Sequence, residues 1–510
     1  MNDGCESPYL IVFDLGSSGG RTYLGWLEGG RLRAEELHRF PNGPVRLGDA
    51  WYWDILRVYD EVLVGLRRAG SRIGSAPALV GVDSWGCDYA YIDASGALLS
   101  PMRHMRDPRT DGVYDAIHAL TPKEELYRRT GAMTIQINTL AQLFAERRAQ
   151  PWLQDSAETL LFTPDLINYF LTGERVTDLT IASTSQIVDP AARRWAPDVL
   201  TSLGLPNHFL GRLVEPGREI GPLRAALQRE TGLGPATRVA AVAGHDTAAA
   251  VAATPFETGR EAAFISLGTW SLLGREAAQP DFSESSLSAN YTNECGVGGR
   301  IVYHKILSGL WLLQECRRIW AVEDPALDFA GLHAAAAEEP PLAFVFDPDD
   351  PCFLNPEHMP SAIADWLTHR GRPAPRSRGA AARAIYDSLA LNFRHALGTM
   401  PRAGSAALDL IHVVGGGAQS PLLCQSAADA TGVPVAAGPV EATVAGNMLC
   451  QLLAAGAIGD LGEGREIIRR SYRQTNYQPR NSAAAGRAYE EFLSLKSVSS
   501  REGSPPSVQS

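Results

Sequence analysis

A glycine-rich turn between two predicted strands constrains the fold of this chain more than any other feature. Residues 11–13 form a short apolar run, and the segment Asp-Leu-Gly-Ser-Ser-Gly-Gly-Arg at 14–21 leads from it into a second apolar run at 22–27. The order is strand, glycine turn, strand, whereas a dinucleotide-binding fingerprint or a P-loop requires a helix directly after the glycines. In this order the backbone amides of a tight β-turn would hold an anion. Because such turns are common, this one assigns no function by itself.

The same pattern recurs halfway along the chain, at residues 262–274. An apolar strand there runs into a small polar turn and returns as a second strand. Two such hairpins, each opening about half of the chain, predict an internal duplication. The length of 510 residues agrees, because single hydrophobic cores stop growing at roughly 250–300 residues. We therefore expect domains at 8–254 and 255–492, and a Ser-, Gly- and Pro-rich tail at 493–510 that we expect to be disordered.

A candidate catalytic aspartate follows a third predicted strand. The apolar run 239–243 predicts a buried strand, Gly244 ends it, and an Ala-rich run after Thr247 predicts a helix. Open α/β sheets bind their ligands at such strand ends, so Asp246 is a candidate general base. His245 is either a ligand contact or a packed core histidine. The alternative for Asp246 or Thr247 is a helix N-cap, which on this stretch alone is the more common role.

Two more glycine-containing turns follow predicted strands. Residues 79–93 predict a hairpin with Asp83, Gly86 and Asp88 at its mouth, although aspartate and glycine also form plain turns. Three glycines at 415–417 separate a predicted strand from a predicted helix. They would let the backbone approach a flat ligand, or they form a flexible turn.

Apolar residues at helical spacing predict several helices. In the helix predicted at 305–320, Ile306 faces inward and Gln314 is the one polar residue beside the apolar face. The other predicted helices cover residues 53–66, 162–173, 380–396 and about 441–453.

The composition limits the classes of partner. Of the residues, 45% are hydrophobic and 20% are charged, which is typical of a soluble globular protein. The net charge is −11 and the basic residues form no patch, which argues against nucleic acid. The seven cysteines are scattered without a Cys-x-x-Cys pair, which favours reduced thiols over disulfides or a zinc site. With no signal peptide and no apolar run near the roughly 20 residues of a membrane span, we expect a cytoplasmic protein that binds no membrane.

Taken together, these motifs resemble the superfamily of actin, the heat-shock chaperone ATPases and the sugar kinases. Within it, their order is similar to that of the FGGY carbohydrate kinases, in particular those that act on L-rhamnulose. The resemblance extends over about residues 9–490 and rests on the segments 14–21, 38–43 (His-Arg-Phe-Pro-Asn-Gly), 81–88 (Gly-Val-Asp-Ser-Trp-Gly-Cys-Asp), 106–110 (Arg-Asp-Pro-Arg-Thr), 244–247 (Gly-His-Asp-Thr), 266–271 (Ser-Leu-Gly-Thr-Trp-Ser), 309–314 (Gly-Leu-Trp-Leu-Leu-Gln), 414–417 (Val-Gly-Gly-Gly) and 437–442 (Ala-Gly-Pro-Val-Glu-Ala). It implies an α/β fold of two ribonuclease-H-like domains, related by duplication, with a nucleotide and sugar cleft between them.

The resemblance also implies an activity, the ATP-dependent phosphorylation of the 1-hydroxyl of L-rhamnulose to L-rhamnulose 1-phosphate in rhamnose catabolism. Asp246 would be the general base, and Gly86, His245, Asp246 and Thr247 would bind the sugar. ATP would be the co-substrate. Asp14 would contact Mg²⁺ through water, because phosphoryl transfer needs the ion to neutralise charge.

The implied nucleotide site draws on both predicted domains. The domain at 8–254 would bind the sugar and carry the first phosphate hairpin, and the domain at 255–492 would bind the nucleotide. The residues concerned are Ser17, Ser18, Gly19, Gly20, Arg21, Thr269, Gln314 and Gly416.

Two residues depart from the pattern of this family. Gly19 replaces the last serine of the Ala-Ser-Ser-Gly-Arg type of turn, which removes a hydroxyl and frees the loop. Ile306 stands where an asparagine that reaches the sugar is expected, and a missing polar partner can change specificity strongly. L-Fuculose or a ketopentose therefore remain alternative substrates. A sugar- and nucleotide-binding sensor without transfer is the alternative of another class. The sequence does not indicate an oligomeric state.

Overall fold

The computed structural model describes residues 7–354, 356–401 and 407–502. The chain forms two compact units, and neither is a single continuous segment. The first unit comprises Met1–Pro255, Glu276–His304 and Glu441–Arg473, and the second comprises Phe256–Arg275, Lys305–Val440 and Gln474–Ser510. The main division at Pro255 lies beside the predicted boundary, but two later segments of the chain return to the first unit.

A six-stranded sheet forms the centre of the first unit, in the order β13-β14-β6-β1-β2-β3. The strands are β1 (Tyr9–Leu15), β2 (Gly19–Glu28), β3 (Arg31–Pro41), β6 (Ala78–Ser84), β13 (Arg218–Pro222) and β14 (Arg238–Ala241). β1 pairs antiparallel with β2 and parallel with β6, and β6 pairs parallel with β14. Ile11, Phe13, Val80 and Val239 are fully buried in the core of this sheet. The carboxyl ends of β1, β6 and β14 therefore lie along one edge.

A second sheet repeats this pattern, in the order β17-β18-β16-β15-β19-β20-β21. Its strands are β15 (Ala262–Leu267), β16 (Trp270–Ala277), β17 (Thr292–Cys295), β18 (Ile301–Ser308), β19 (Leu410–Val414), β20 (Val435–Ala437) and β21 (Thr475–Tyr477). β15 pairs antiparallel with β16 and parallel with β19, and β19 pairs parallel with β20. This order matches β2-β1-β6-β14, so the two sheets show the internal duplication that the two hairpins predicted.

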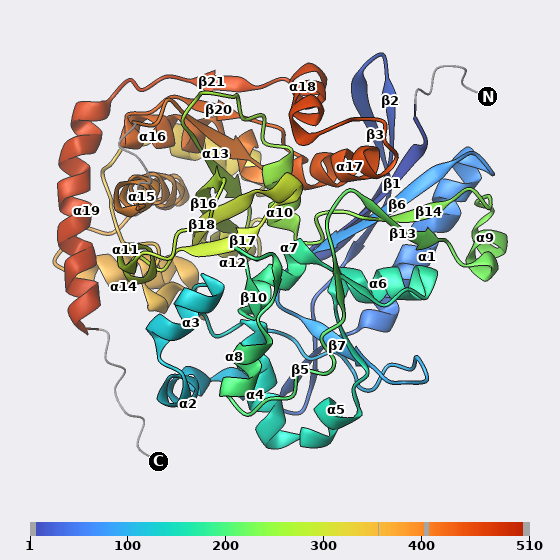
Figure 1. The fold of residues 1–510 in the computed structure, drawn as a ribbon. Coiled ribbons are helices and arrows are strands. Elements are labelled where there is room, and N and C mark those ends of the chain that lie inside the picture. Colours follow the sequence, from blue (N-terminus) through green and yellow to red (C-terminus); the bar gives the residue numbers. More distant parts are fainter. Residues whose placement is uncertain (1–6, 355, 402–406, 503–510) are drawn as a thin grey trace. The chain divides into compact units, whose positions relative to one another are not determined.

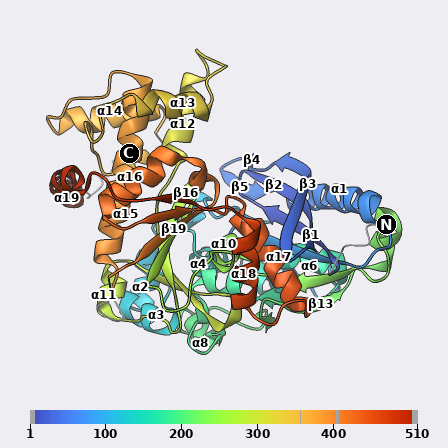
Figure 2. The same cartoon turned by 90° about the horizontal axis from the view of Figure 1, so that it is seen from above.

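The sheets are accompanied by helices and short two-stranded ladders (Figures 1 and 2). The helices of the first unit are α1 (Ile55–Ile73), α2 (Val113–Leu120), α3 (Lys123–Thr130), α4 (Thr139–Ala149), α5 (Pro151–Ser156), α6 (Thr163–Thr172), α7 (Leu179–Ala182), α8 (Pro197–Ser202), α9 (Ala225–Thr231), α10 (Asp246–Ala252), α11 (Glu284–Ser288), α17 (Ala442–Ala454) and α18 (Leu461–Ser471). Those of the second unit are α12 (Trp311–Trp320), α13 (Phe329–Ala337), α14 (Met359–His369), α15 (Arg378–Thr399), α16 (Pro421–Thr431) and α19 (Ser482–Glu502). The short strands are β4 (Pro44–Leu47), β5 (Ala50–Trp53), β7 (Tyr89–Ile92), β8 (Thr159–Phe162), β9 (Val176–Asp178), β10 (Val188–Asp189), β11 (Arg194–Trp195) and β12 (Arg212–Val214). Short 3₁₀ turns cover Pro108–Thr110, Ser183–Ser185, Val297–Gly299, Pro351–Phe353 and Gly416–Gln419. No helix in these described segments is both long and apolar enough to cross a bilayer.

The prediction of a helix at 305–320 is wrong for the first turn. Residues 305–308 belong to β18, whose first half pairs with β17, and α12 begins only at Trp311. Gly309 separates the two elements, because a Cβ at this position would lie 2.6 Å from the carbonyl oxygen of Thr269. A short apolar run fits a strand as well as a helix by periodicity, and here the strand ladder decides.

The hairpin predicted at 79–93 is also wrong. β6 ends at Ser84 and stays in the large sheet, whereas β7 pairs antiparallel with β8 instead of returning along β6. Between the two strands, Cys87 takes a positive φ of 74°, and its N–H donates to the hydroxyl of Thr184. The contact with Thr184 and the pairing with β8 thus accompany the turn of the chain away from β6.

Helix α19 continues through Glu502, beyond the predicted start of the tail at residue 493. Phe492 and Leu495 are buried, and the ammonium group of Lys496 lies 2.8 Å from a carboxylate oxygen of Asp347. These contacts give the helix partners in the second unit. Residues 503–510 lie outside the described part of the chain.

Helix α17 shows how closely the distant segments of the first unit pack. Figure 1 shows it, in orange-red, beside the blue strand β1, and it also packs on α10. A Cβ added to Gly446 would lie 1.8 Å from the carbonyl oxygen of Ala249 in α10. Only glycine allows this approach of the two backbones.

We expect Gly446→Ala to lower the free energy of unfolding by about 1–3 kcal/mol, because the overpacking outweighs the better helix propensity of alanine. The matched control is Gly486→Ala in α19, where an added Cβ meets nothing within 4 Å. That change should be neutral or should raise the free energy of unfolding by up to about 1 kcal/mol. Chemical denaturation of both variants, followed by circular dichroism, would contradict this account if Gly446→Ala proved the more stable of the two.

Candidate active site

Three aspartates lie at the carboxyl ends of neighbouring parallel strands in the first unit. Asp14 in β1 and Asp83 in β6 are register partners, and Asp246 is the first residue of α10, after β14. The N–H of Ser84 donates to the carbonyl of Gly244 at 2.8 Å and joins the ends of β6 and β14. The sheet therefore brings together residues that are far apart in the sequence, at the edge where open α/β sheets bind ligands.

Asp83 is the most deeply buried of the three. One carboxylate oxygen accepts a hydrogen bond from the amide of Asn447 at 2.6 Å, and the other is buried without a hydrogen-bond partner among the described residues. Burial raises the pKa of Asp83 well above its ordinary value, and the neighbouring Asp14 raises it further. The surroundings therefore disfavour the ionised form of this carboxyl group more than water would.

The glycine-rich turn joins β1 to β2, as predicted. The N–H of Gly16 donates to the carbonyl of Gly19 at 2.9 Å, and the side chains of Ser17 and Ser18 are exposed. A Cβ on Gly20 would lie 2.2 Å from the ring of Phe40, so this position requires glycine. The turn presents two exposed serine side chains on a closely packed base.

Arg21 is held by two carboxylates just after this turn. Its guanidinium lies 2.5 Å from Asp14 and 2.7 Å from Glu441, which directly precedes α17. Glu441 belongs to the segment 437–442 but was not predicted as a site residue. The two contacts fix the direction of the guanidinium, a group well suited to phosphate oxygens.

The turn that carries Asp246 differs from a simple helix cap. His245 occupies the N-cap position without a side-chain hydrogen bond to the helix, and the hydroxyl of Thr247 donates to the Asp246 carboxylate at 3.1 Å. The alternative in which Asp246 or Thr247 serves only as the N-cap is therefore wrong. The Asp246 side chain is 38% exposed, so a ligand can reach it. Partial burial raises its pKa, and Asp14 adds to this effect, whereas His245 opposes it.

Asp178 holds the backbone of this turn, a role that the sequence did not reveal. Its Oδ1 accepts the N–H groups of Thr180 at 2.9 Å and of Gly244 at 3.0 Å. The hydroxyl oxygen of Thr180 accepts the N–H of His245 at 3.2 Å. Burial raises the pKa of Asp178 to about 6. The only sequence signal was its place before the hydroxyl-rich run 180–185.

A second unpredicted carboxylate, Glu294 in β17, lies beside His245. Its Oε2 is 2.9 Å from Nδ1 of His245, and its Oε1 is 3.6 Å from Nε2 of His304 in β18. All three side chains are buried. Burial lowers the pKa of His245, but Glu294, Asp246 and Asp178 together outweigh this effect and raise the pKa to about 8. His245 is thus buried and lies in contact with a carboxylate. The alternative of a packed core histidine did not include this contact.

Gly86 and Asp88 follow the end of β6. A Cβ on Gly86 would meet the side chain of Thr184 at 3.1 Å, so the glycine makes room for this neighbour. Asp88 accepts the indole N–H groups of Trp53 at 2.6 Å and Trp85 at 2.9 Å. Burial raises the pKa of Asp88 to about 6. Asp88 therefore anchors two aromatic side chains instead of facing a ligand.

The remaining predicted site residues lie in the second unit. The hydroxyl of Thr269, in the turn between β15 and β16, donates to the side-chain oxygen of Gln314 in α12 at 3.2 Å. Of the three glycines after β19, Gly417 packs against Leu267, whereas a Cβ on Gly416 would meet nothing within 4 Å. Gly416 thus leaves open space above the backbone. Ile306 lies half-buried in β18.

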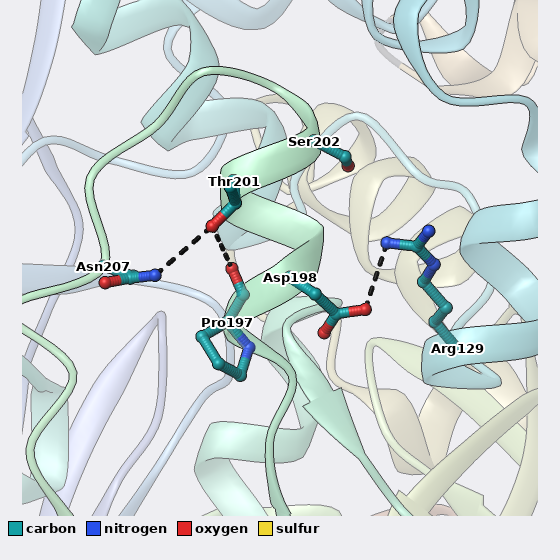
Figure 3. A pocket seen from close by; sticks show the side chains of 6 residues that line it. All are labelled: Arg129, Pro197, Asp198, Thr201, Ser202 and Asn207. Atoms are coloured by element: carbon teal, nitrogen blue, oxygen red, sulfur yellow. Dashed lines mark hydrogen bonds and ion pairs between the residues drawn. The ribbon is translucent and has the colours of Figure 1, made fainter.

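A separate pocket of about 470 Å³ lies between α3 and α8 in the first unit (Figure 3). Arg129 and Asp198 form an ion pair across it at 3.1 Å. Its other lining residues are Pro197, Thr201, Ser202 and Asn207. None of the predicted site residues lines this pocket, so it is not the candidate active site.

The oxygen groups around the glycine turn suit magnesium better than a softer metal. Among the described residues, no group of three or more His, Cys, Asp or Glu side chains is arranged to hold a metal ion. Mg²⁺ does not need such a cage, because it keeps several waters and binds through one or two carboxylates and substrate phosphates. The carboxylate of Asp14 and the exposed hydroxyls of Ser17 and Ser18 fit that mode of binding.

Comparison with known proteins decides the family. The model of the FGGY family of carbohydrate kinases, N-terminal domain, matches residues 9–252, and that of the C-terminal domain matches residues 263–455. The chain belongs to the FGGY family of carbohydrate kinases. The family resemblance and the fold class that the motifs implied are confirmed.

Relatives of this FGGY family member share most of its length. It is 40% identical to a rhamnulokinase of Bacteroides thetaiotaomicron over 95% of this chain and 98% of the relative. It is 37% identical to a rhamnulokinase of Pectobacterium atrosepticum over 95% of this chain and 96% of the relative.

Solved structures show the same fold at lower identity. A ligand-bound xylulose kinase from Lactobacillus acidophilus matches with a TM-score of 0.79 and 15% identity, over 97% of this chain and 99% of that one. A xylulose kinase from Rhodospirillum rubrum matches with a TM-score of 0.75 and 21% identity, over 96% and 98%. These likenesses establish the two-domain α/β fold of sugar kinases for this chain.

The raised pKa of Asp88 predicts a pH-dependent stability. Its pKa rises on folding from 3.8 to about 6, so ionisation costs the folded state more than the unfolded state. The contribution of Asp88 to the free energy of unfolding of the wild type therefore falls by up to about 3 kcal/mol as the pH rises from about 4 to about 6. Asp88→Asn cannot ionise, and its stability relative to wild type should increase over the same window.

Urea unfolding at several pH values between 4 and 7 measures this difference. The control is Asp93→Asn, because the pKa of the exposed Asp93 is lowered, first by the hydroxyl of Ser95. The control should show no gain as the pH rises. A constant difference between Asp88→Asn and wild type would contradict the burial of an ionised Asp88.

Proposed function

We propose that this chain phosphorylates the 1-hydroxyl of L-rhamnulose with ATP and Mg²⁺, giving L-rhamnulose 1-phosphate and ADP. The observation that carries the proposal is the run of relatives named rhamnulokinase, at 34–40% identity over at least 91% of this chain. The substrates are a small ketose and a nucleotide, and we place the reaction in the cytoplasm as a step of rhamnose breakdown.

Asp246 acts as the general base in this proposal. Its carboxylate is exposed enough to meet a substrate hydroxyl and takes the proton as that oxygen forms a bond to the γ-phosphorus. The bond between the γ-phosphorus and the β–γ bridging oxygen breaks, and ADP leaves. His245 and Thr247 flank the base and contact the sugar together with Gly86, which follows the end of β6.

The phosphate groups lie against the turn between β1 and β2. Ser17, Ser18, Gly19 and Gly20 offer hydroxyl and backbone N–H donors, and Arg21 offers a guanidinium that Asp14 and Glu441 keep in place. Mg²⁺ supplies charge neutralisation for the transfer when it is bound. Asp14 would hold this ion through water.

The second unit supplies the rest of the nucleotide site. Thr269 and Gln314 are already hydrogen-bonded to each other, and Gly416 leaves room for a flat ring to approach the backbone. In this division of labour, the domain at 8–254 binds the sugar and the first phosphates, and the domain at 255–492 binds the nucleotide.

Asp246→Asn tests the chemistry. Asparagine keeps the size of the side chain but accepts no proton, so we expect kcat to fall by about 10²–10⁴-fold. A coupled ADP-release assay measures the turnover, and calorimetry with Mg-ATP serves as the control for nucleotide binding, which should be unchanged. Wild-type turnover in this variant would contradict the assignment of the base.

A substrate panel tests the identity of the sugar, with Ile306 as the residue to change. Ile306 cannot make the hydrogen bond expected of an asparagine in this position, so the panel includes L-fuculose and ketopentoses, although the relatives named rhamnulokinase do not favour them. We expect L-rhamnulose to give the highest kcat/KM among L-rhamnulose, L-fuculose, L-ribulose, D-xylulose and glycerol. Ile306→Asn should lower the KM for the preferred ketose and leave the KM for ATP unchanged.

Each outcome of the panel has a distinct meaning. A preference for another ketose would replace the substrate and keep the kinase. An absence of ADP release with every sugar would favour the non-catalytic sensor.

A further inference from the structure

Glu294 is a buried carboxylate close to the proposed base, and the mechanism above gives it no role. Its side chain is only 7% exposed, and it lies between two histidines. Its Oε2 faces Nδ1 of His245 at 2.9 Å, and the other ring nitrogen of His245 faces Oδ1 of Asp246 at 3.5 Å. The four side chains of His304, Glu294, His245 and Asp246 thus form a row that leads from the core to the exposed base.

The backbone holds Glu294 firmly at this place. On one side, Asn293 donates its N–H to the carbonyl of Gly131 at 2.9 Å, and on the other, Cys295 donates its N–H to the hydroxyl of Ser183 at 2.9 Å. Thr292 pairs with His304 in the ladder of β17 and β18, so Glu294 and His304 are diagonal neighbours on one face. Three connections to separate parts of the first unit therefore hold the backbone of β17 in place at Glu294.

We propose that Glu294 is a positioning residue that fixes the imidazole of His245 in its charged form and thereby keeps Asp246 ready to accept a proton. The distances from the two ring nitrogens to Glu294 and Asp246 are those of ion pairs, and an imidazolium carries an N–H on both nitrogens, whereas a neutral ring would turn a lone pair toward one of the carboxylates. This inference rests on the proposed role of Asp246 and deepens it.

The charged groups around the row support this assignment. His245 faces Glu294 from β17, Asp246 from its own helix and Asp178 from the end of β9, and all three raise its pKa against the effect of burial. His304 faces the opposite side of Glu294, and burial lowers its pKa despite that carboxylate. Asp246 faces His245, which lowers its pKa, and Asp14, which raises it. Of the two histidines, His245 is therefore the one whose charged form is favoured by its surroundings.

The test measures the pKa of His245 directly, in the enzyme without substrates, by NMR of labelled imidazole groups. The signal is assigned by its loss in His245→Gln. Glu294→Gln keeps the shape and removes the charge, so we expect the pKa of His245 to fall by about one unit or more. Glu294→Asp keeps the charge but withdraws it by one methylene group, so the fall should be smaller. An unchanged pKa in both variants would overturn the proposal.

His304→Leu is the matched control, because it disturbs the same buried cluster and leaves Glu294 and His245 in contact. The pKa of His245 should not fall in this variant, and a fall equal to that in Glu294→Gln would overturn the proposal by showing a general packing effect. If Glu294→Gln does not fold, Glu294→Asp and His304→Leu still decide the question.

Turnover gives a second readout. Without the charge on His245, the pKa of Asp246 should rise, so the acid limb of kcat/KM for the sugar should move to higher pH in Glu294→Gln and largely return in Glu294→Asp. A uniform loss of rate without this shift would contradict the positioning role. Because the NMR titration needs no substrate, failure of the proposed kinase activity in the wild type is distinguishable from failure of this inference.

Discussion

The hydrogen bond between Ser84 and Gly244 joins two strand ends on which the candidate site depends. The parallel pairing of β1, β6 and β14 sets three aspartates on one edge, and this contact brings the turn with Asp246 against the end of β6. Carboxylates placed so closely in a protein interior repel one another. The surrounding cations and amides, above all Arg21, His245 and Asn447, oppose this repulsion. The sheet thus forces the three carboxylates together, and the neighbouring cations and amide groups offset the repulsion between them.

The glycines fall into two groups with different consequences. Gly20, Gly417 and Gly446 permit contacts between packed groups, so their absence of a side chain serves the architecture. Gly416 has open space above it, and the serines of the first turn are exposed, so these positions are available to a ligand. Glycine therefore allows close packing at some positions and leaves space for a ligand at another.

Local patterns in the sequence predicted much of the fold. The two glycine hairpins, the strand before Asp246 and the duplication are visible because a strand, a turn and a helix each leave a short-range signal. The first turn of the helix at 305–320 and the hairpin at 79–93 failed, because the pairing of β18 with β17 and of β7 with β8 depends on distant residues. Glu294, Asp178 and Asn447 were missed for the same reason: each reaches the site only through the folded sheet.

The packing of α17 against α10 has a consequence for the order in which this protein forms on the ribosome. Helix α17 comes from the last part of the chain, yet it packs on β1, β6 and α10 of the first unit. The first unit therefore cannot be complete when residue 255 leaves the exit tunnel, although all six strands of its central sheet have been synthesised by then. The surface that α17 covers in the folded protein includes Gly81 and the backbone of Ala249. This surface stays exposed until the chain has been synthesised through residue 454. The N-terminal half therefore supplies most of a compact unit, but that unit cannot be completed before the C-terminal part of the chain has been synthesised.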